Sequence, residues 1–265
     1  MIRDITLGQY YPVSSNIHSL DPRTKILMTF AYIFSLFMLN TFWGYAFVTL
    51  VLFTVIKMSK VPIKFMFKGL KGIIYILIFT MLLNVFFSAG KNILFEWGIL
   101  RITGEGIMLA IKMAARLILL IVGSSLLTLT TSPIQLTDGI ESLLRPFSKI
   151  GVPAHEIAMM MSIALRFIPI LLEETDKIMK AQMARGADFE SGNIIKRAKA
   201  MIPIMVPLFI SAFRRAEDLA MAMEARCYKG GEGRTRMNSL KYETKDAIAF
   251  LGGILFILIC ILPMI

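Results

Sequence analysis

Two matched endings, AQMARG at residues 181–186 and AMEARC at residues 222–227, decide how this sequence is organised. Each places an Ala-Arg pair at the end of a long helical run, and an acid, Asp176 or Glu217, stands nine residues before each arginine. A glycine after a helix allows a left-handed closing residue, and an arginine in the last turn complements the helix dipole. A single ending of this kind is an ordinary helix C-terminus. Its repetition, with a slim alanine before each arginine, favours two tips that enter grooves on partners and bind carboxylates there.

The composition is that of a polytopic membrane protein. The 265 residues are 56% hydrophobic, with a mean hydropathy of +0.69, well above the apolar share of soluble domains. The net charge of +11 is explained by lysines and arginines in cytoplasmic loops. The basic residues are not interleaved with aromatics as in nucleic-acid-binding proteins, so we expect no nucleic acid partner. The two cysteines, Cys227 and Cys260, form neither a disulfide framework nor a metal site.

Five apolar runs predict five membrane spans, so we expect an all-α membrane protein in contact with the lipid bilayer. The predicted spans are residues 24–40, 42–58, 70–88, 107–131 and 247–265. The first follows a polar lead, residues 1–23, that lacks a small-residue cleavage site, which favours a retained span over a signal peptide. Asp21-Pro22 is a suitable helix start, because aspartate can cap a helix and proline fits its first turn.

Five lysines, one at the end of the second span and four after it, set the predicted topology. Lys57, Lys60, Lys64, Lys68 and Lys71 have no acid among them, and their steps of three and four predict one basic face on an interfacial helix. An excess of lysine marks the cytoplasmic side. We therefore expect the N-terminus in the cytoplasm and, after five spans, the C-terminus outside.

The middle of the chain, residues 132–238, differs from the membrane block of residues 24–131 and from the last helix in residues 239–265. Prolines punctuate it and predict shorter amphipathic helices. Arg166 and Pro169 interrupt one apolar run, and Pro203 and Pro207 lie in another that is too short to span comfortably. A helix over residues 155–185 would be roughly 45 Å long, against a hydrocarbon core of about 30 Å. We expect these helices to lie along the inner face or slant into the cytoplasm.

Enzymatic readings find little support. His155-Glu156 begins like a zinc-protease motif, but the residue four positions after His155 is Met159 rather than histidine. His18 is the only other histidine, and no nucleotide-binding loop or nucleophile elbow is present. We therefore expect no catalysis and no metal site in this chain.

Several motifs taken together resemble the transmembrane coupling component, or T component, of energy-coupling factor vitamin importers, relatives of the cobalt and nickel importers. The stretches that carry the resemblance are Gly8-Gln9-Tyr10-Tyr11-Pro12, Ser15 with His18, Leu20-Asp21-Pro22-Arg23-Thr24-Lys25, Thr131-Ser132-Pro133, Arg166-Phe167-Ile168-Pro169 through Glu173, Ala181 to Gly186, and Glu224-Ala225-Arg226-Cys227-Tyr228. They cover nearly the whole chain in order, which is specific where each motif alone is not.

The resemblance implies transmembrane helices plus cytoplasmic coupling helices, two of which cross. Their tips are expected in grooves on two ATP-binding-cassette ATPase subunits, which would hold ATP and magnesium, while this chain binds no cofactor. The tip residues are Ala184, Arg185 and Gly186 in the first motif and Ala225, Arg226 and Cys227 in the second. Supporting positions are Asp176, Glu217, Arg166, Pro169, Pro203 and Pro207. Cysteine replaces the usual glycine at Cys227, which puts the geometry of that helix end in question.

The resemblance also implies a separate membrane protein, the S component, which binds the substrate and packs on the crossed helices. On this hypothesis ATP binding changes the spacing of the tips, the helices shear, and the S component tips or is released. The alternative is a self-sufficient secondary transporter, which needs charged or broken helices in mid-membrane. Lys112 and Arg116, one turn apart in the fourth predicted span, are its only candidates.

Overall fold

The computed structural model describes residues 10–39, 41–87, 93–97, 100–189, 193–231 and 239–261. Predicted features on other residues, among them Gly8, Gln9 and the ends of three predicted spans at 40, 88 and 262–265, lie outside these ranges. The described residues separate into two compact units. One contains Gly8–Gly139 and Ser239–Ile265, and the other contains Ile140–Asn238.

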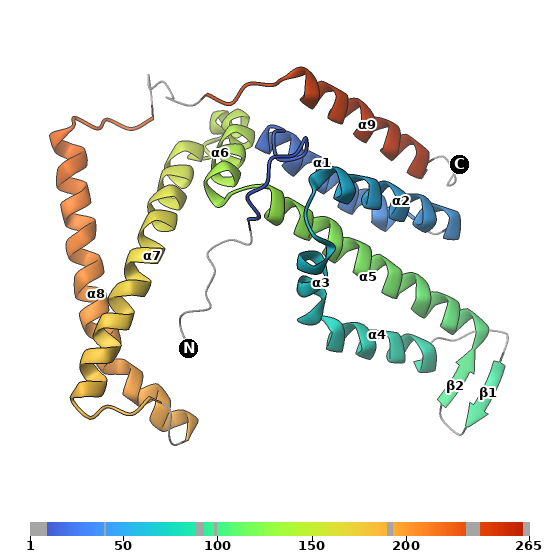
Figure 1. Cartoon of the computed structure of the whole chain (residues 1–265), viewed down its shortest axis with the longest axis horizontal. Coiled ribbons are helices and arrows are strands. Elements are labelled where there is room, and N and C mark those ends of the chain that lie inside the picture. The colour runs from blue at the N-terminus through green and yellow to red at the C-terminus, as the bar shows by residue number, and fades with distance from the viewer. Residues whose placement is uncertain are drawn as a thin grey trace. The chain divides into compact units, whose positions relative to one another are not determined.

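The elements confirm the all-α class and add one small hairpin that the sequence analysis did not anticipate. In chain order, with the labels of Figure 1, they are α1 (Pro22–Met38), α2 (Phe42–Ser59), α3 (Ile63–Lys71), α4 (Ile74–Phe87), β1 (Ile93–Trp97), β2 (Leu100–Thr103), α5 (Gly104–Thr130), α6 (Pro133–Leu144), a 3-10 helix (Arg145–Ile150), α7 (Ala154–Ala184), α8 (Ile194–Ala225) and α9 (Thr244–Ile261). The two strands pair antiparallel and lead into α5.

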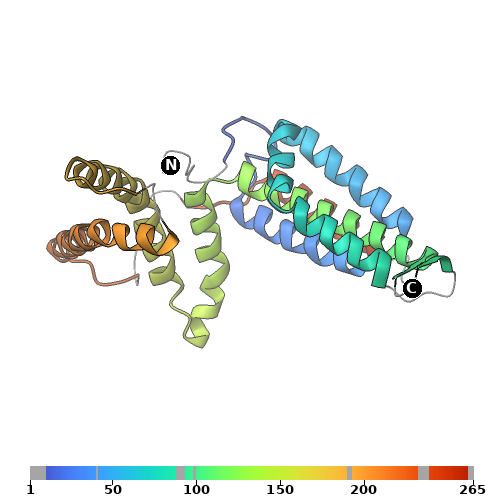
Figure 2. The same cartoon turned by 90° about the horizontal axis from the view of Figure 1, so that it is seen from below.

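The first unit packs around α5, which contacts α1, α2, α3 and α4, while α9 packs on α1. Figures 1 and 2 show α1, α2 and α5 running side by side. The buried side chains of this core are Leu36, Leu39, Tyr45, Val48, Leu52, Val61, Met66, Leu119, Val122, Leu126, Leu129 and Cys260. Most are branched aliphatics, which pack closely without leaving polar atoms unsatisfied.

A close approach between α1 and α5 depends on a glycine. The hydroxyl of Tyr32 on α1 donates a 2.9 Å hydrogen bond to the carbonyl of Leu119 on α5. A Cβ atom at Gly123, one turn further along α5, would collide with the Tyr32 ring. Small residues of this kind let membrane helices approach closely.

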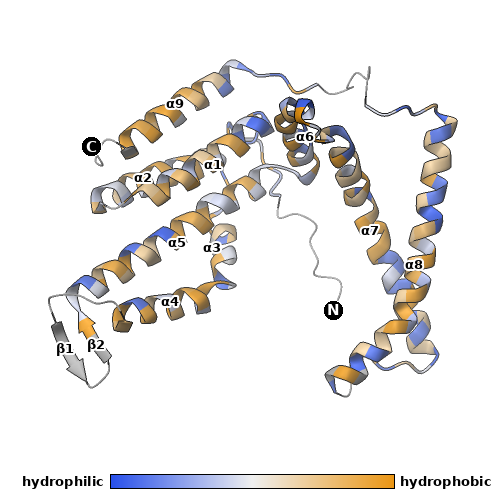
Figure 3. Cartoon of the chain, turned by 180° about the vertical axis from the view of Figure 1, so that it is seen from behind, coloured by the Kyte–Doolittle hydropathy of each residue, from blue (hydrophilic) through white to orange (hydrophobic). Residues whose placement is uncertain are grey.

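The outward faces of these helices are apolar. Phe30, Phe34, Leu50, Phe53 and Phe79 each expose more than half of their surface, and Figure 3 shows hydrophobic residues dominating α1, α2, α4, α5 and α9. Such a large exposed apolar surface suits lipid rather than water.

Three described helices, α2, α5 and α7, are long and apolar enough to cross a membrane, or four if α3 and α4 count as one bent span. The first and last of the five predicted spans correspond to α1 and α9, of 17 and 18 residues, and are not among the three. The number five therefore stays a prediction. By length and composition α7 also qualifies, although we expected it at the inner face.

The five lysines do not share one helical face, so that prediction was wrong. α2 ends where Lys60 adopts a left-handed conformation, with φ of 56°, and its backbone N–H bonds to the carbonyl of Lys57. Pro62 then starts α3 as its N-cap. Lys60 and Pro62 thus form a turn that separates Lys57 on α2 from the lysines of α3. The sequence spacing of the lysines predicts one face only if the helix is continuous.

A polar cluster fixes the start of α1. Asp21 caps the helix as predicted, its carboxylate accepting a 2.9 Å hydrogen bond from the backbone N–H of Arg23, with Pro22 in the first turn. The backbone N–H of Asp21 donates in turn to the carboxylate of Asp246 on α9, at 2.9 Å. Burial acts to raise the pKa of Asp21, but the hydrogen bonds and charge of Arg23 outweigh it and leave that pKa below its usual value.

The lead before α1 is ordered by His18. Its Nδ1 lies 2.7 Å from the hydroxyl of Ser15, and its Nε2 lies 3.0 Å from the carbonyl of Tyr11. Because a carbonyl only accepts, Nε2 carries the proton and Nδ1 accepts from Ser15. Burial, assisted by the charge of Lys25, lowers the pKa of His18 below 6.5.

The second unit is dominated by two long helices. α7 has 31 residues and α8 has 32, with Pro169 inside the first and Pro203 and Pro207 inside the second. The prediction of shorter helices punctuated by these prolines was therefore wrong. Each proline removes one backbone hydrogen bond, which bends a helix more readily than it ends one when tertiary packing continues. Figure 1 shows α8 changing direction along its length.

Candidate functional site

The first tip ends α7 with a pair of hydrogen bonds that close the helix. The N–H of Gly186 bonds to the carbonyl of Met183 at 2.9 Å, and the N–H of Ala187 bonds to that of Gln182 at 3.0 Å. Gly186 has a φ of 87°. This is the Schellman arrangement, with the left-handed residue directly after the terminal arginine, Arg185.

The second tip repeats this geometry at the end of α8. The N–H of Cys227 bonds to the carbonyl of Glu224 at 2.8 Å, and the N–H of Tyr228 bonds to that of Met223 at 3.0 Å. Cys227 has a φ of 55° and so takes the left-handed conformation that glycine takes in the first tip. A non-glycine residue adopts it at a cost of about 1–2 kcal/mol. The departure from glycine therefore leaves the helix end unchanged in form.

The tips present their arginines to the surroundings. Ala184, Arg185 and Gly186 are exposed, and so are Ala225, Arg226 and Cys227. Within the described residues, neither Arg185 nor Arg226 makes a side-chain hydrogen bond or ion pair. Two exposed guanidinium groups held at rigid helix ends can bind carboxylates bidentately.

The structure does not bring the supporting acids to these arginines. Nine residues correspond to about two and a half helical turns, which places Asp176 on the face of α7 away from Arg185, and Glu217 likewise on α8. Asp176 is half-buried and Glu217 is exposed. Arg166 and Pro169 are exposed on α7, whereas Pro207 lines a surface hollow on α8.

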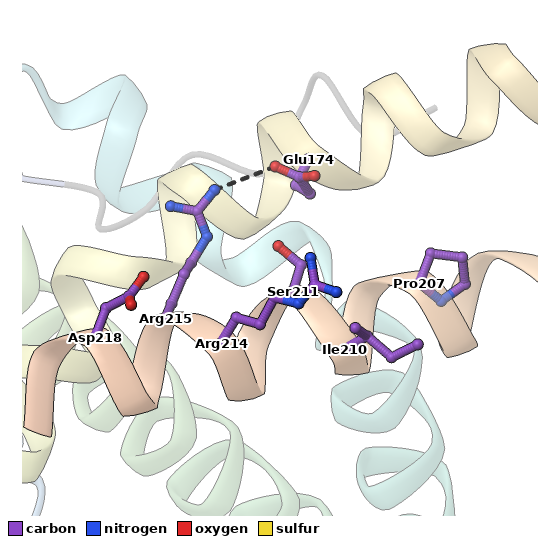
Figure 4. Close-up of a pocket in the computed structure, with 7 residues that line it drawn as sticks. All are labelled: Glu174, Pro207, Ile210, Ser211, Arg214, Arg215 and Asp218. Carbon is purple, nitrogen blue, oxygen red and sulfur yellow. Dashed lines mark hydrogen bonds and ion pairs between the residues drawn. The ribbon is translucent and has the colours of Figure 1, made fainter.

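A different pair joins the two helices, and the sequence analysis missed it. Nη2 of Arg215 on α8 donates to Oε2 of Glu174 on α7 at 3.2 Å, as Figure 4 shows. Glu174 and Arg215 each precede their terminal arginine by eleven residues, or about three turns, and so lie on the face that carries that arginine. The spacing of eleven places each residue on the face of its terminal arginine, but it does not identify the partner on the other helix.

The end of α8 is tied to the beginning of α7. The hydroxyl of Tyr228 lies 3.3 Å from Nε2 of His155, and Nδ1 of His155 lies 3.2 Å from Oε1 of Glu141. His155 therefore has structural partners on both of its ring nitrogens. Among the residues that the structure describes, no group of three His, Cys, Asp or Glu side chains could hold a metal ion.

The charged residues of α5 make local contacts. Arg116 donates from Nη2 to the carbonyl of Leu39 at 2.8 Å and from Nε to the hydroxyl of Tyr45 at 3.2 Å. Lys112 places its ammonium 5.3 Å from the ring centroid of Phe42. Arg116 therefore satisfies a carbonyl at the end of α1, a structural role that needs no transported ion.

Comparisons with known proteins agree over nearly the whole chain. The family model described as "Cobalt transport protein", CbiQ, matches residues 13–237. The chain is 59% identical to the energy-coupling factor transporter transmembrane protein EcfT of Clostridium kluyveri, over 100% of this chain and 98% of that protein. It is 59% identical to the protein of the same name from Thermosediminibacter oceani, over 95% and 94% of the two chains. For the Bacillus subtilis protein of that name the identity is 47%, over 97% and 99%. This chain therefore belongs to the family of the cobalt transport protein CbiQ and of the transmembrane proteins of energy-coupling factor transporters.

Proposed function

We propose that this chain is the non-catalytic coupling subunit of an ATP-driven importer of vitamins or other micronutrients. It transmits conformational change from two ATP-binding-cassette subunits to a separate substrate-binding membrane protein. ATP and magnesium are bound by the ATPases and not by this chain. The names of the relatives, which place them in energy-coupling factor transporters, support this role.

The observation that carries the proposal is the identity of the two tips. Both helices close with the same pair of hydrogen bonds and end in an exposed arginine that makes no ion pair among the described residues. Two equal attachment points suit two similar partners.

In the proposed mechanism Arg185 and Arg226 hold the tips of α7 and α8 in grooves on the ATPases. When ATP draws the ATPases together, the spacing of the tips changes and the crossed helices shear. The substrate-binding protein that packs on them then tips or leaves, and its cargo passes into the cytoplasm. With five spans, as predicted, we also propose that the N-terminus lies in the cytoplasm and the C-terminus outside.

The alternative, a self-sufficient secondary transporter, is weakened at Arg116, one of its two candidate residues. Arg116 already contacts the carbonyl of Leu39 and the hydroxyl of Tyr45. A group that relays a transported ion must exchange its partners during the cycle. The structural role of Arg116 does not need such exchange.

The test is a mild-detergent pull-down of the tagged chain from its own membranes, comparing wild type with the double variant Arg185→Glu, Arg226→Glu. We expect wild type to bring down two ATPases and a small hydrophobic membrane protein, and the double variant to insert normally but lose the ATPases. Each single variant should lose less, because the remaining tether keeps the effective concentration high.

The matched control is Lys180→Glu with Lys229→Glu, which makes the same charge change at exposed positions close to the two tips. It should keep both ATPases. A double arginine variant that still held both ATPases would refute the assignment of the tips, and wild type that came down alone under several detergents would refute the coupling role.

A further inference from the structure

The two long helices carry opposite charges at matched positions. Counting eleven residues back from Arg185 and Arg226 leads to Glu174 and Arg215, and the preceding residues are Glu173 and Arg214. The matched endings therefore extend backward into a pattern that is Glu-Glu on α7 and Arg-Arg on α8. Attraction between opposite charges favours pairing of the two helices over pairing of either helix with a copy of itself. Glu173 and Arg214 are exposed and lie about 100° round their helices from Glu174 and Arg215, so they are not part of the contact itself.

The structure brings the second member of each matched pair together. Arg215 and Glu174 are joined at 3.2 Å, from Nη2 to Oε2. Each lies about 16 Å along its own helix from the terminal arginine, at 1.5 Å per residue. The colours of Figure 1 show that α7 and α8 run in opposite directions past one another. The contact thus lies between the two tips and equally far from each.

The ion pair is single and accessible. The side chains of Arg215 and Glu174 are 37% and 29% exposed, and they border a hollow of about 440 Å³ lined by Pro207, Ile210, Ser211, Arg214 and Asp218. Figure 4 shows Arg215 reaching from α8 toward α7 while Arg214 is not joined to Glu174. Nε of Arg215 is buried and has no hydrogen-bond partner within the described residues. A partly exposed pair of this kind adds little to overall stability, so its removal should leave the fold intact and change only how the two helices meet.

We propose that Glu174 and Arg215 are positioning residues, which fix the register at which the two coupling helices cross and thereby the distance between the arginine tips. The effect on transport rests on the proposed function. The register of the two helices does not, because both residues belong to this chain. The residues act through the tips and do not themselves bind the ATPases.

The first test is a charge exchange in the assembled transporter. Glu174→Arg and Arg215→Glu each oppose like charges across the crossing, and the double exchange restores the attraction. We expect both single variants to keep the ATPases in a pull-down but to transport about fivefold less substrate per ATP hydrolysed in proteoliposomes. The double exchange should return this ratio to within about twofold of wild type.

The matched controls are Glu173→Arg and Arg214→Glu, which make the same charge changes one residue earlier on each helix, and they should stay near wild type.

The second test uses the full-length chain without partners. Spin labels on cysteines at Lys180 and Met221, in a Cys227→Gly, Cys260→Ala background, report the distance between equivalent exposed positions near the two tips. We expect each single charge variant to shift or broaden the distance distribution and the double exchange to restore it. A distribution unchanged by the single variants, or a double exchange as altered as its parents, would overturn the proposal. If wild type brings down no ATPases while the distances behave as expected, the proposed function fails and the positioning pair stands.

Discussion

Cys227 and Gly186 adopt the same left-handed backbone conformation at the ends of two different helices, with φ of 55° and 87°. In both, the N–H of the residue and the N–H of its successor return to carbonyls of the last helical turn. A cysteine is held where glycine is the relaxed choice, so the conformation is imposed by the helix end and not by the residue.

Cys227→Gly should therefore stabilise the end of α8, and Gly186→Cys should destabilise the end of α7, each by about 1 kcal/mol. Thermal unfolding in detergent, followed by circular dichroism, measures both. The two substitutions control one another, because they should change the unfolding temperature in opposite directions at matched positions. Both sites are exposed, so neither substitution removes a packing contact. Equal effects of the same sign would contradict the shared geometry.

Replacing either tip arginine by lysine should weaken ATPase attachment although the charge is kept. Lysine cannot offer the two parallel N–H donors that a guanidinium presents to a carboxylate. We expect about a tenfold loss of affinity for Arg185→Lys with Arg226→Lys, less than for the glutamate variants. Titration of purified ATPases against the chain in nanodiscs measures this. Full affinity in the lysine variant would show that charge alone attaches the tips.

Gly123→Ala should separate α1 from α5, because a Cβ atom there meets the ring of Tyr32. Overpacking of this kind costs about 1–3 kcal/mol. The control is Gly252→Ala in α9, where a Cβ atom has no neighbour within 4 Å and where alanine favours the helix by up to about 1 kcal/mol. Thermal stability of the two variants in the same detergent should change in opposite directions.

The lead before α1 should become less stable as the pH falls below 6.5. The pKa of His18 is lowered in the folded chain, mainly by burial, so the unfolded chain takes up the proton first. The contribution of neutral His18 to the free energy of unfolding is complete above pH 6.5. It falls as the pH drops toward the pKa that His18 has in the folded chain, and below that pKa it is constant. The difference in stability between wild type and His18→Gln, measured from pH 8 to pH 5, isolates this contribution. A difference that grew on acidification would contradict the direction of the shift.

The exposed thiol of Cys227 gives a direct test of orientation. A membrane-impermeant maleimide should label Cys227 in inverted vesicles stripped of the ATPases and not in intact cells, if the coupling helices face the cytoplasm. Cys260 is buried in α9 and should stay unlabelled in both. Thr41→Cys in a Cys227→Ser background reports the other side, because Thr41 is exposed between the first two predicted spans. Labelling of both cysteines from one side would contradict the predicted topology.

Long apolar runs were predicted closely, because burial in lipid leaves a strong and simple pattern. α2 begins at Phe42 as expected, and α5 covers the predicted run with three extra residues at its start. The helix cap at Asp21 was also predicted correctly, because an aspartate before a proline can accept a hydrogen bond from a free backbone N–H of the first turn without any distant contact.

The errors arose where local signals compete with packing. Pro169, Pro203 and Pro207 weaken a helix locally, yet α7 and α8 continue through them because each helix packs on the other. Lys60 breaks a helix although lysine itself favours helices, since Pro62 follows and the chain must turn there. The pair Glu174 and Arg215 joins residues 41 apart, and no spacing within one helix predicts which residues of another will meet it.

The equal distances of Arg185 and Arg226 from the contact between Glu174 and Arg215 have a mechanical consequence. With arms of about 16 Å, a rotation of about 10° at the crossing moves each tip by about 3 Å. Because the helices run in opposite directions, the two displacements have the same size and opposite sense. A movement of either tip about this contact is therefore matched by a movement of the same size at the other tip, so the two partners undergo displacements of equal amplitude.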